Sequence, residues 1–314
     1  MGTPVLLDCD PGHDDAVAIW LAAASPAIDL LGITTVAGNQ TLPKTTLNAR
    51  RIATVAGITS VPVAAGRAEP LHGPLNGPLR TAPGIHGETG LDGSAFGEPT
   101  VPVEPVGAVE FMRRVILATD RPVTLVATGP LTNVAALLLA HPDVSARLHE
   151  IVVMGGSTER GNVTPYAEFN VHVDPEAADI VLRSGLPVTM CGLNVTHQAL
   201  ATGDVLDRIA ALGTPLARIC VELLTFFAAS YRRVFGFDAP PLHDPVAVAR
   251  VIDPAVVTTV AANVAVELAG THTRGATVVD LDEVTGRPPN ARVAVSLDAD
   301  RFWELIVAAV AALG

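Results

Sequence analysis

Short runs of β-branched residues alternate along this chain with longer segments rich in Ala and Leu. This alternation is typical of βαβ units, in which buried parallel strands are joined by helices that cover both faces of one sheet. We therefore expect an α/β fold with a central, mostly parallel β-sheet flanked by helices, in a Rossmann-like open arrangement. No shift in composition, linker or repeat of fixed period divides the 314 residues, so a single domain over residues 1–314 is expected.

The two kinds of segment predict the individual elements. Strands are predicted at residues 5–9, 30–35, 61–64, 123–127, 151–154, 188–191, 256–266, 277–280 and 291–297. Helices are predicted at residues 14–24, 42–56, 106–118, 131–140, 175–184, 203–212, 215–233, 245–251 and 301–313. Residues 66–105 and 155–172 are dense in Gly, Pro, Asn and Thr and match neither pattern. Loops of that length in a compact domain usually carry function. Because ligands of open α/β sheets bind at the carboxyl ends of the strands, we expect the active site there.

The composition excludes several partners. The chain has 20 Lys and Arg against 32 Asp and Glu, a net charge of −12, and Lys44 is its only lysine. Phosphate backbones and anionic lipids require clustered basic residues, so neither nucleic acid nor a membrane is expected as a partner. Residues 122–141 are uncharged, but turn residues in their middle predict a strand and a helix rather than a membrane span. Three cysteines and no basic, apolar leader predict a cytoplasmic protein without disulfides.

Four carboxylates follow the first predicted strand in the octet Asp8-Cys9-Asp10-Pro11-Gly12-His13-Asp14-Asp15. A tight turn at Pro-Gly brings Asp10, at the strand end, to face Asp14 and Asp15, at the helix start. Carboxylates this close repel one another. A helix N-terminus offsets only ~0.3–1 kcal/mol of that repulsion, whereas a bound hard cation offsets more. A single Asp here would fit equally well as a helix cap. The group as a whole predicts a metal or catalytic site.

The octet resembles the Asp-x-Asp-Pro-Gly-x-Asp-Asp signature of the inosine-uridine preferring nucleoside hydrolases. Other segments match that family in order, each after a predicted strand: Val36-Ala37-Gly38-Asn39, Thr128-Gly129-Pro130, Met154-Gly155-Gly156, Gly161-Asn162-Val163-Thr164-Pro165, Glu168-Phe169-Asn170 and His243-Asp244-Pro245. The matches extend over nearly the whole chain. The resemblance implies an enzyme that hydrolyses the N-glycosidic bond of inosine- or uridine-type ribonucleosides, its small-molecule substrates, to ribose and a free base.

The resemblance also implies a role for each matched residue. A Ca²⁺ ion would be held by Asp10, Asp15, the backbone carbonyl of Thr128, and Asp244. Asp10 would also accept the proton of the Ca²⁺-bound water that attacks the sugar, and His243 would protonate the leaving base. Substrate binding would fall to Asp14, Asn39, Met154, Asn162, Glu168, Phe169, Asn170, Tyr231 and His86. A homodimer or homotetramer is implied as well.

Two other functions compete with this interpretation. A haloacid-dehalogenase-like, Mg²⁺-dependent phosphatase also carries two aspartates after its first strand, which would make Asp8 the nucleophile, but Lys44 then lies in the wrong segment. A non-catalytic riboside-binding module would use the same ligands without turnover. Neither a dinucleotide fingerprint nor a nucleotide phosphate loop occurs. Both tryptophans, Trp20 and Trp303, fall in predicted helices, so a tryptophan-stacked purine pocket is not expected, and His243 with Tyr231 favours inosine-uridine or pyrimidine preference.

Overall fold

Nine strands form one sheet in the computed structural model, which describes residues 2–73 and 79–314. Across the sheet the order is β3-β2-β1-β4-β5-β6-β9-β7-β8. The strands are β1 (Thr3–Cys9), β2 (Ile28–Thr35), β3 (Val63–Ala65), β4 (Val123–Ala127), β5 (Leu148–Met154), β6 (Val188–Cys191), β7 (Val257–Val266), β8 (Thr277–Asp280) and β9 (Ala291–Leu297). All nine predicted strands are confirmed, with small differences at their ends. The strands from β3 through β9 in this order are parallel, and β7 runs antiparallel to both β9 and β8.

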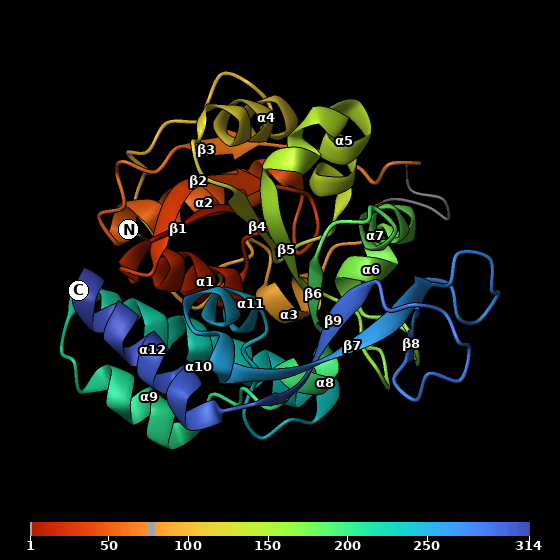
Figure 1. The fold of residues 1–314 in the computed structure, drawn as a ribbon. Coiled ribbons are helices and arrows are strands. Elements are labelled where there is room, and N and C mark those ends of the chain that lie inside the picture. The colour runs from red at the N-terminus through yellow and green to blue at the C-terminus, as the bar shows by residue number, and fades with distance from the viewer. Residues whose placement is uncertain (1, 74–78) are drawn as a thin grey trace.

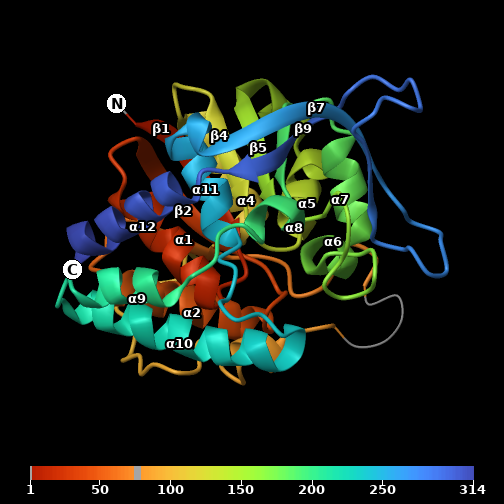
Figure 2. The same ribbon diagram turned by 90° about the horizontal axis from the view of Figure 1, so that it is seen from below.

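Helices cover both faces of this sheet, as Figures 1 and 2 show. Within β1, Val5 and Leu7 belong to one core cluster and Leu6 to the other, because alternate side chains of a strand point to opposite faces. On one face, α1 (His13–Ala24), α2 (Leu42–Val55) and α11 (Asp244–Ile252) pack next to the sheet. Beyond them, α9 (Gly203–Ala210), α10 (Pro215–Phe235) and α12 (Ala299–Leu313) pack against these helices and against one another. The other face packs against α4 (Ala108–Ala118), α5 (Thr132–Ala140) and α7 (Pro175–Leu182). The predicted α/β fold is therefore confirmed.

Several short elements were not predicted from the sequence. They are α3 (Pro83–His86), α6 (Phe169–Val173), α8 (Leu193–Thr196) and two 3₁₀ turns, Pro142–Arg147 and Pro254–Val256. Elements of three to six residues are too short to show a helical period, so the pattern of apolar residues gave no signal. Of these, α3 lies in the long segment 66–105, of which residues 74–78 are outside the described part. Among residues 2–73 and 79–314, no helix has the length and apolar character needed to cross a bilayer.

The order of the strands in the sheet determines where the site lies. Strand β1 pairs with β2 on one side and β4 on the other, so the connections that leave it diverge in opposite directions. Ligands of open α/β sheets bind at such a point, outside the carboxyl ends of the strands. The segments that follow β1, β2, β4 and β5 contain the matched motifs, and the N-termini of α1 and α11 reach the same edge.

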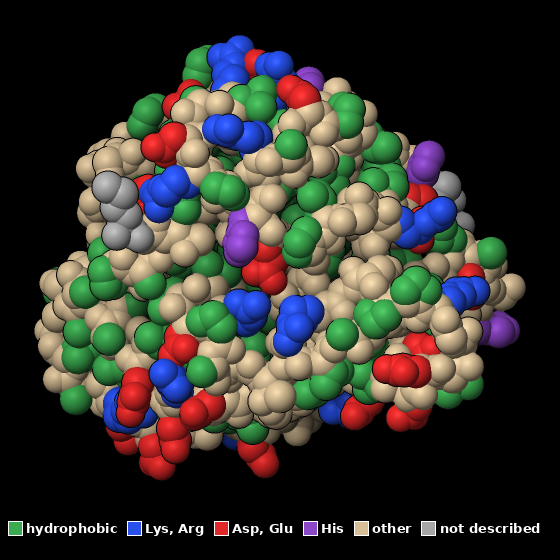
Figure 3. Space-filling model, in the orientation of Figure 1, with side chains coloured by type: hydrophobic (Ala, Val, Ile, Leu, Met, Phe, Trp, Pro, Cys, Tyr) green, Lys and Arg blue, Asp and Glu red, His purple; other side chains and the backbone are tan. Residues whose placement is uncertain are grey.

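On the face shown in Figure 3, acidic and basic side chains are interspersed with apolar ones, and acidic side chains gather at its lower left.

Candidate active site

A cavity of about 230 Å³ lies at this edge of the sheet. Twelve of the fourteen predicted site residues line it: Asp14, Asn39, His86, Thr128, Met154, Asn162, Glu168, Phe169, Asn170, Tyr231, His243 and Asp244. The two others, Asp10 and Asp15, are buried at 1% and 0% exposure and are linked to the lining by hydrogen bonds. Residues from one end of the chain to the other are therefore brought to one place, as the strand-end argument predicts.

The Asp10 carboxylate is enclosed by backbone. The backbone N–H of Asn39 donates to its Oδ2 at 2.7 Å. A Cβ atom added to Gly38 would lie 2.1 Å from Oδ2, and one added to Gly129 would lie 2.6 Å from Oδ1, so only glycine fits at either position. Its Oδ1 is buried and has no hydrogen-bond partner among the described residues. One oxygen of Asp10 is thus fixed, and the other remains available to accept.

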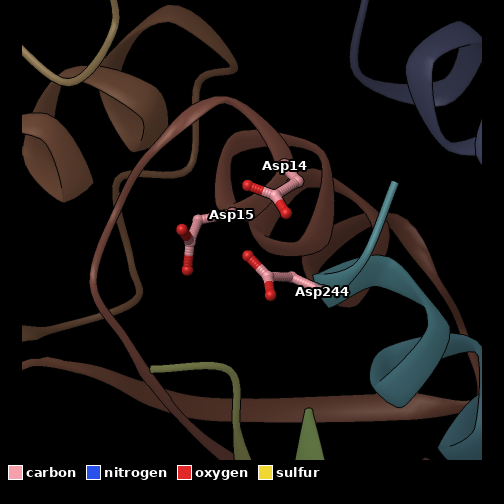
Figure 4. A group of neighbouring side chains, drawn as sticks. All are labelled: Asp14, Asp15 and Asp244. Atoms are coloured by element: carbon pink, nitrogen blue, oxygen red, sulfur yellow. The ribbon is translucent and has the colours of Figure 1, made fainter. Parts of the chain in front are cut away.

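Three further carboxylates converge beside it. Asp14 and Asp15 lie in the first turn of α1, and Asp244 is the first residue of α11; in Figure 4 their side chains point toward one another. One oxygen from each lies within 4.8 Å of the others. The Asp15 carboxylate accepts from the Gly12 backbone N–H (2.9 Å) and from Thr128 Oγ1 (3.0 Å). The positive ends of two helix dipoles therefore meet at a cluster of negative charge.

Burial makes this cluster costly to ionise. Burial and the neighbouring Asp15 carboxylate raise the pKa of Asp10 well above its usual range, and the same two causes raise the pKa of Asp14 to about 7. Burial also raises the pKa values of Asp15 and Asp244. Among the described residues, none of the four forms an ion pair. Buried carboxylates with unpartnered oxygens and no basic partner fit a hard divalent cation, which prefers oxygen ligands.

A second set of side chains comes from the segment after β5. The Glu168 carboxylate accepts from the backbone N–H groups of Gly156 (2.9 Å), Asn170 (2.9 Å) and Val171 (3.1 Å), and so caps the N-terminus of α6. The Asn170 amide nitrogen donates to the Thr128 carbonyl at 2.7 Å. The Asn162 Oδ1 accepts from the backbone N–H of Phe169 at 2.9 Å. Each polar side chain on this wall of the cavity is held by backbone.

His243 belongs to a buried chain of hydroxyl and imidazole groups. Its Nδ1 is 2.7 Å from Thr196 Oγ1, and its Nε2 is 2.6 Å from the Tyr231 hydroxyl. Burial and nearby His197 lower the pKa of His243 to about 3, and burial raises the pKa of Tyr231. The imidazole is therefore neutral at pH 7, and the proton that it holds can pass only along one of these two hydrogen bonds.

His86 reaches the cavity from α3 and is held by His13, to which the sequence assigned no role. The Nδ1 atoms of the two rings are 3.1 Å apart, and His13 Nε2 lies 2.8 Å from the Asp92 carbonyl. His13 also stacks on Phe226 and Phe227. Burial lowers the pKa of His13 to about 4 and holds the pKa of His86 well below its usual range. Both rings are neutral at pH 7 and act as a rigid wall.

Other residues that the sequence singled out lie away from the cavity. Phe227 is fully buried and packs edge-on against Tyr231, with ring centroids 4.7 Å apart. Trp20 and Trp303 lie in helices, as predicted, and both are buried in the core. The Lys44 amine donates to the Glu88 carbonyl at the surface. Asp8 is not among the described residues of the cavity lining, which argues against its use as a phosphatase nucleophile.

Sequence reasoning missed Thr196 and His13. Thr196 is the last residue of α8, the short helix that follows β6. Applying the strand-end rule to β6 would have identified Thr196 as a candidate site residue. The contact between His13 and His86 joins positions that are 73 residues apart in the chain, and no local sequence pattern predicts it.

Comparison with known proteins adds independent information. The sequence profile described as "Inosine-uridine preferring nucleoside hydrolase" matches residues 5–304. The chain is 46% identical over 307 residues to the pyrimidine-specific ribonucleoside hydrolase RihA of Photobacterium profundum, covering 98% of each chain. It is 48% identical over 307 residues to RihA of Escherichia coli O81 (strain ED1a), covering 98% of this chain and 97% of that one. A purine-preferring ribonucleoside hydrolase from Gardnerella vaginalis has a similar structure, with a TM-score of 0.91, 33% identity and 99% coverage of both chains.

Proposed function

The chain belongs to the inosine-uridine preferring nucleoside hydrolase family and is therefore a hydrolase of N-glycosyl bonds, and we propose that it cleaves uridine, cytidine and inosine to ribose and free base. Relatives named as pyrimidine-specific support a preference for pyrimidine bases within this set. The observation that carries the proposal is the convergence of buried carboxylates and amides in one cavity at the carboxyl edge of the sheet.

Once the hydrogen bonds within the protein are counted, the polar groups of the cavity that remain free to bind the substrate are mainly hydrogen-bond acceptors. Asn39 and Asn170 both use their amide nitrogens within the protein, so each has its Oδ1 left to accept. Glu168 and Asp14 add carboxylate oxygens, and an ionised carboxylate accepts up to about four hydrogen bonds. Ribose hydroxyls are donors to such a wall. An acidic wall also stabilises the positive charge that develops on the sugar as the glycosidic bond breaks.

The acidic cluster fits Ca²⁺, and we assign Asp10, Asp15, the Thr128 carbonyl and Asp244 to it. When bound, the cation offsets the mutual repulsion of the carboxylates and makes a water easier to deprotonate. Asp14 shares the cluster geometrically. We assign it to the ribose because one of its oxygens is unpartnered within the described structure and its side chain lines the cavity.

Asp10 is proposed to accept the proton of the attacking water. Its Oδ2 is fixed by the Asn39 N–H and its Oδ1 is open, so the carboxylate has both a set orientation and a site for the proton. The water oxygen bonds to the anomeric carbon as the carbon–nitrogen bond breaks, and the electron pair of that bond goes to the base. A positioned general base contributes about 10²–10⁴-fold to the rate.

The departing base needs a proton in turn. Tyr231 and His243 both line the cavity and share a 2.6 Å hydrogen bond. Because the imidazole is neutral, we propose that it acts as a relay: the Tyr231 hydroxyl donates to the base, and His243 Nε2 returns a proton to Tyr231 as Nδ1 takes one up on the Thr196 side. The proton that Asp10 took from the attacking water returns through solvent and balances this transfer. The predictions of a cytoplasmic location and of a homodimer or homotetramer rest on the sequence and the resemblance alone and stay predictions.

Reducing-sugar release from uridine, cytidine, inosine and adenosine tests this function. Each substrate is assayed with the protein loaded with Ca²⁺ and with the same protein after complete chelation. We expect ribose release from the first three, fastest from the pyrimidine nucleosides, and loss of release after chelation that added Ca²⁺ restores. Release of ribose from none of them would refute the function, and undiminished release after chelation would refute the role of the cation.

A further inference from the structure

Three consecutive residues, two before β8 and the first of β8 itself, contact the segment 155–172 at three separate points. A Cβ atom on Gly275 would lie 3.0 Å from the His172 Cα, so the two backbones touch. The next residue, Ala276, forms an antiparallel bridge with Ala167. The third, Thr277, hydrogen-bonds to Ser157. Strand β8 pairs with β7 at the edge of the sheet and is only partly buried: Val279 packs against the core, whereas Val278 is 57% exposed.

The Thr277 hydroxyl is fully used by the loop. It accepts from the Ser157 backbone N–H at 2.8 Å and donates to the Ser157 carbonyl at 2.6 Å. The preceding residue, Gly156, has a positive φ of +72°, and a Cβ atom there would lie 2.8 Å from Thr277 Cγ2. The turn at Gly156 and Ser157 is therefore fixed both by hydrogen bonds and by close contact with one side chain.

This turn leads directly to the cavity. The Gly156 N–H donates to Glu168 Oε2 at 2.9 Å, while its carbonyl accepts from the Leu193 N–H at 2.9 Å. Glu168 in turn caps α6, whose second residue, Asn170, bonds to the Thr128 carbonyl. A shift of the turn would move the N–H that Glu168 accepts from, and with it the carboxylate that faces the substrate.

We propose that Thr277 is a positioning residue for ribose binding: its hydroxyl holds the Gly156–Ser157 turn so that the Glu168 carboxylate keeps its place in the cavity. The inference deepens the proposed function and rests on it, since Glu168 is assigned there to the ribose. Because every ribonucleoside carries the same sugar, the effect of Thr277 on binding is independent of the base.

The kinetic test compares three variants. Thr277→Val keeps the side-chain shape and removes the hydroxyl, and Thr277→Ser keeps the hydroxyl. Thr285→Val removes a hydroxyl from the segment that follows β8, where it bonds to Asp280 instead. A hydrogen bond of ordinary net strength is worth about 3- to 10-fold in affinity. We expect Thr277→Val to raise KM by about that factor, equally for uridine, cytidine and inosine, and any fall in kcat to be equal for all three, because Glu168 also faces the charge that develops on the sugar. Thr277→Ser and Thr285→Val should retain the parent KM. An unchanged KM, a base-dependent change, or failure of Thr277→Ser to restore KM would overturn the proposal.

Hydrogen–deuterium exchange supplies a readout that needs no activity. In Thr277→Val, peptides covering residues 155–172 should exchange faster, while those covering β1 and α1 stay as in the parent protein. If the parent hydrolyses no riboside, the proposed function fails, yet exchange still decides whether Thr277 holds the loop. Unchanged exchange over residues 155–172 would overturn the proposal, and Thr277→Ala replaces the valine variant if the latter does not fold.

Discussion

The Asp10 carboxylate is tightly enclosed by the backbone around it, which fixes its position. Two glycines, Gly38 and Gly129, approach it so closely that any side chain there would displace it, and the Asn39 N–H fixes one of its oxygens. Such restraint suits a group that must meet a proton at one place, since a base already held in its reacting geometry loses no orientational entropy during the reaction.

Substitution of this residue separates catalysis from folding. We expect Asp10→Asn to lower kcat by about 10²–10⁴-fold, because the amide keeps the size of the side chain and loses the proton acceptor. The melting temperature should not fall, since an uncharged group replaces a buried carboxylate whose pKa is raised. Turnover is followed by ribose release and folding by circular dichroism. Activity within about 10-fold of the parent would remove Asp10 from the role of base.

His243 offers a test of how the base departs. We expect His243→Ala to lower kcat by about 10²-fold on uridine and by a different factor on inosine, because bases that differ in proton affinity depend differently on the relay. Thr196→Val, which removes the hydroxyl bonded to Nδ1 but keeps the imidazole, should cost about 10-fold or less. Equal losses on all bases would argue against proton delivery to the leaving group.

Among the helices, α3 forms one wall of the cavity and is held in place by a hydrogen bond from α10. The Arg233 Nη2 donates to the Gly84 carbonyl at 2.7 Å, within the short helix that carries His86. The next basic side chain along α10, Arg232, instead donates to the Asp238 carbonyl.

This neighbouring pair supplies a variant and its control. Arg233→Ala should raise KM by about 2- to 10-fold, because the wall that contacts the substrate loses a hydrogen bond that holds it. Arg232→Ala should leave KM unchanged. Steady-state kinetics on uridine measures both. Equal effects of the two substitutions would mean that α3 does not depend on this bond.

Predictability from sequence also differs between elements. Parallel strands are buried on both faces and occur as apolar, β-branched runs, so every strand was found. Part of the candidate site could be assembled because its residues follow strand ends, and strand ends of a parallel sheet meet. The residues on or beside α3, α10 and α11, which are His86, Tyr231, His243 and Asp244, were assigned from the family resemblance instead. The contacts that hold the site residues in place could not be predicted from the sequence. His13 with His86 and Thr277 with Ser157 join segments far apart in the chain, and their pairing depends on how loops pack after the sheet has formed.

For the molecule as a whole, the buried carboxylates make stability depend on pH and on cations. Burial raises the folded-state pKa of Asp14 and of Asp8 to about 7, from an unfolded value of 3.8. Between the unfolded value and about pH 8 the folded state therefore binds more protons than the unfolded state, so these two groups lower the free energy of unfolding as pH rises through their folded pKa. Below pH 6.5 the buried histidines, such as His243, oppose this trend, because their pKa values are lowered on folding.

A melting series checks this linkage. The chelated protein should melt several degrees lower at pH 8.5 than at pH 6.5. Saturating Ca²⁺ should raise the melting temperature most at pH 8.5, because a cation that binds only the folded state stabilises it by mass action and replaces the missing protons. Mg²⁺ at the same concentration serves as the comparison ion. Coincident melting curves with chelator and with Ca²⁺ would contradict the assignment of the cluster as a cation site.

The single lysine of this chain has a practical consequence. Lys44 is the only side-chain amine, it lies on α2, and it donates to the Glu88 carbonyl two residues beyond His86. An amine-reactive fluorophore therefore attaches to one side chain, next to the segment that forms a wall of the cavity. Without any engineered cysteine, a dye at this position would report on changes around that segment when nucleosides bind in the cavity.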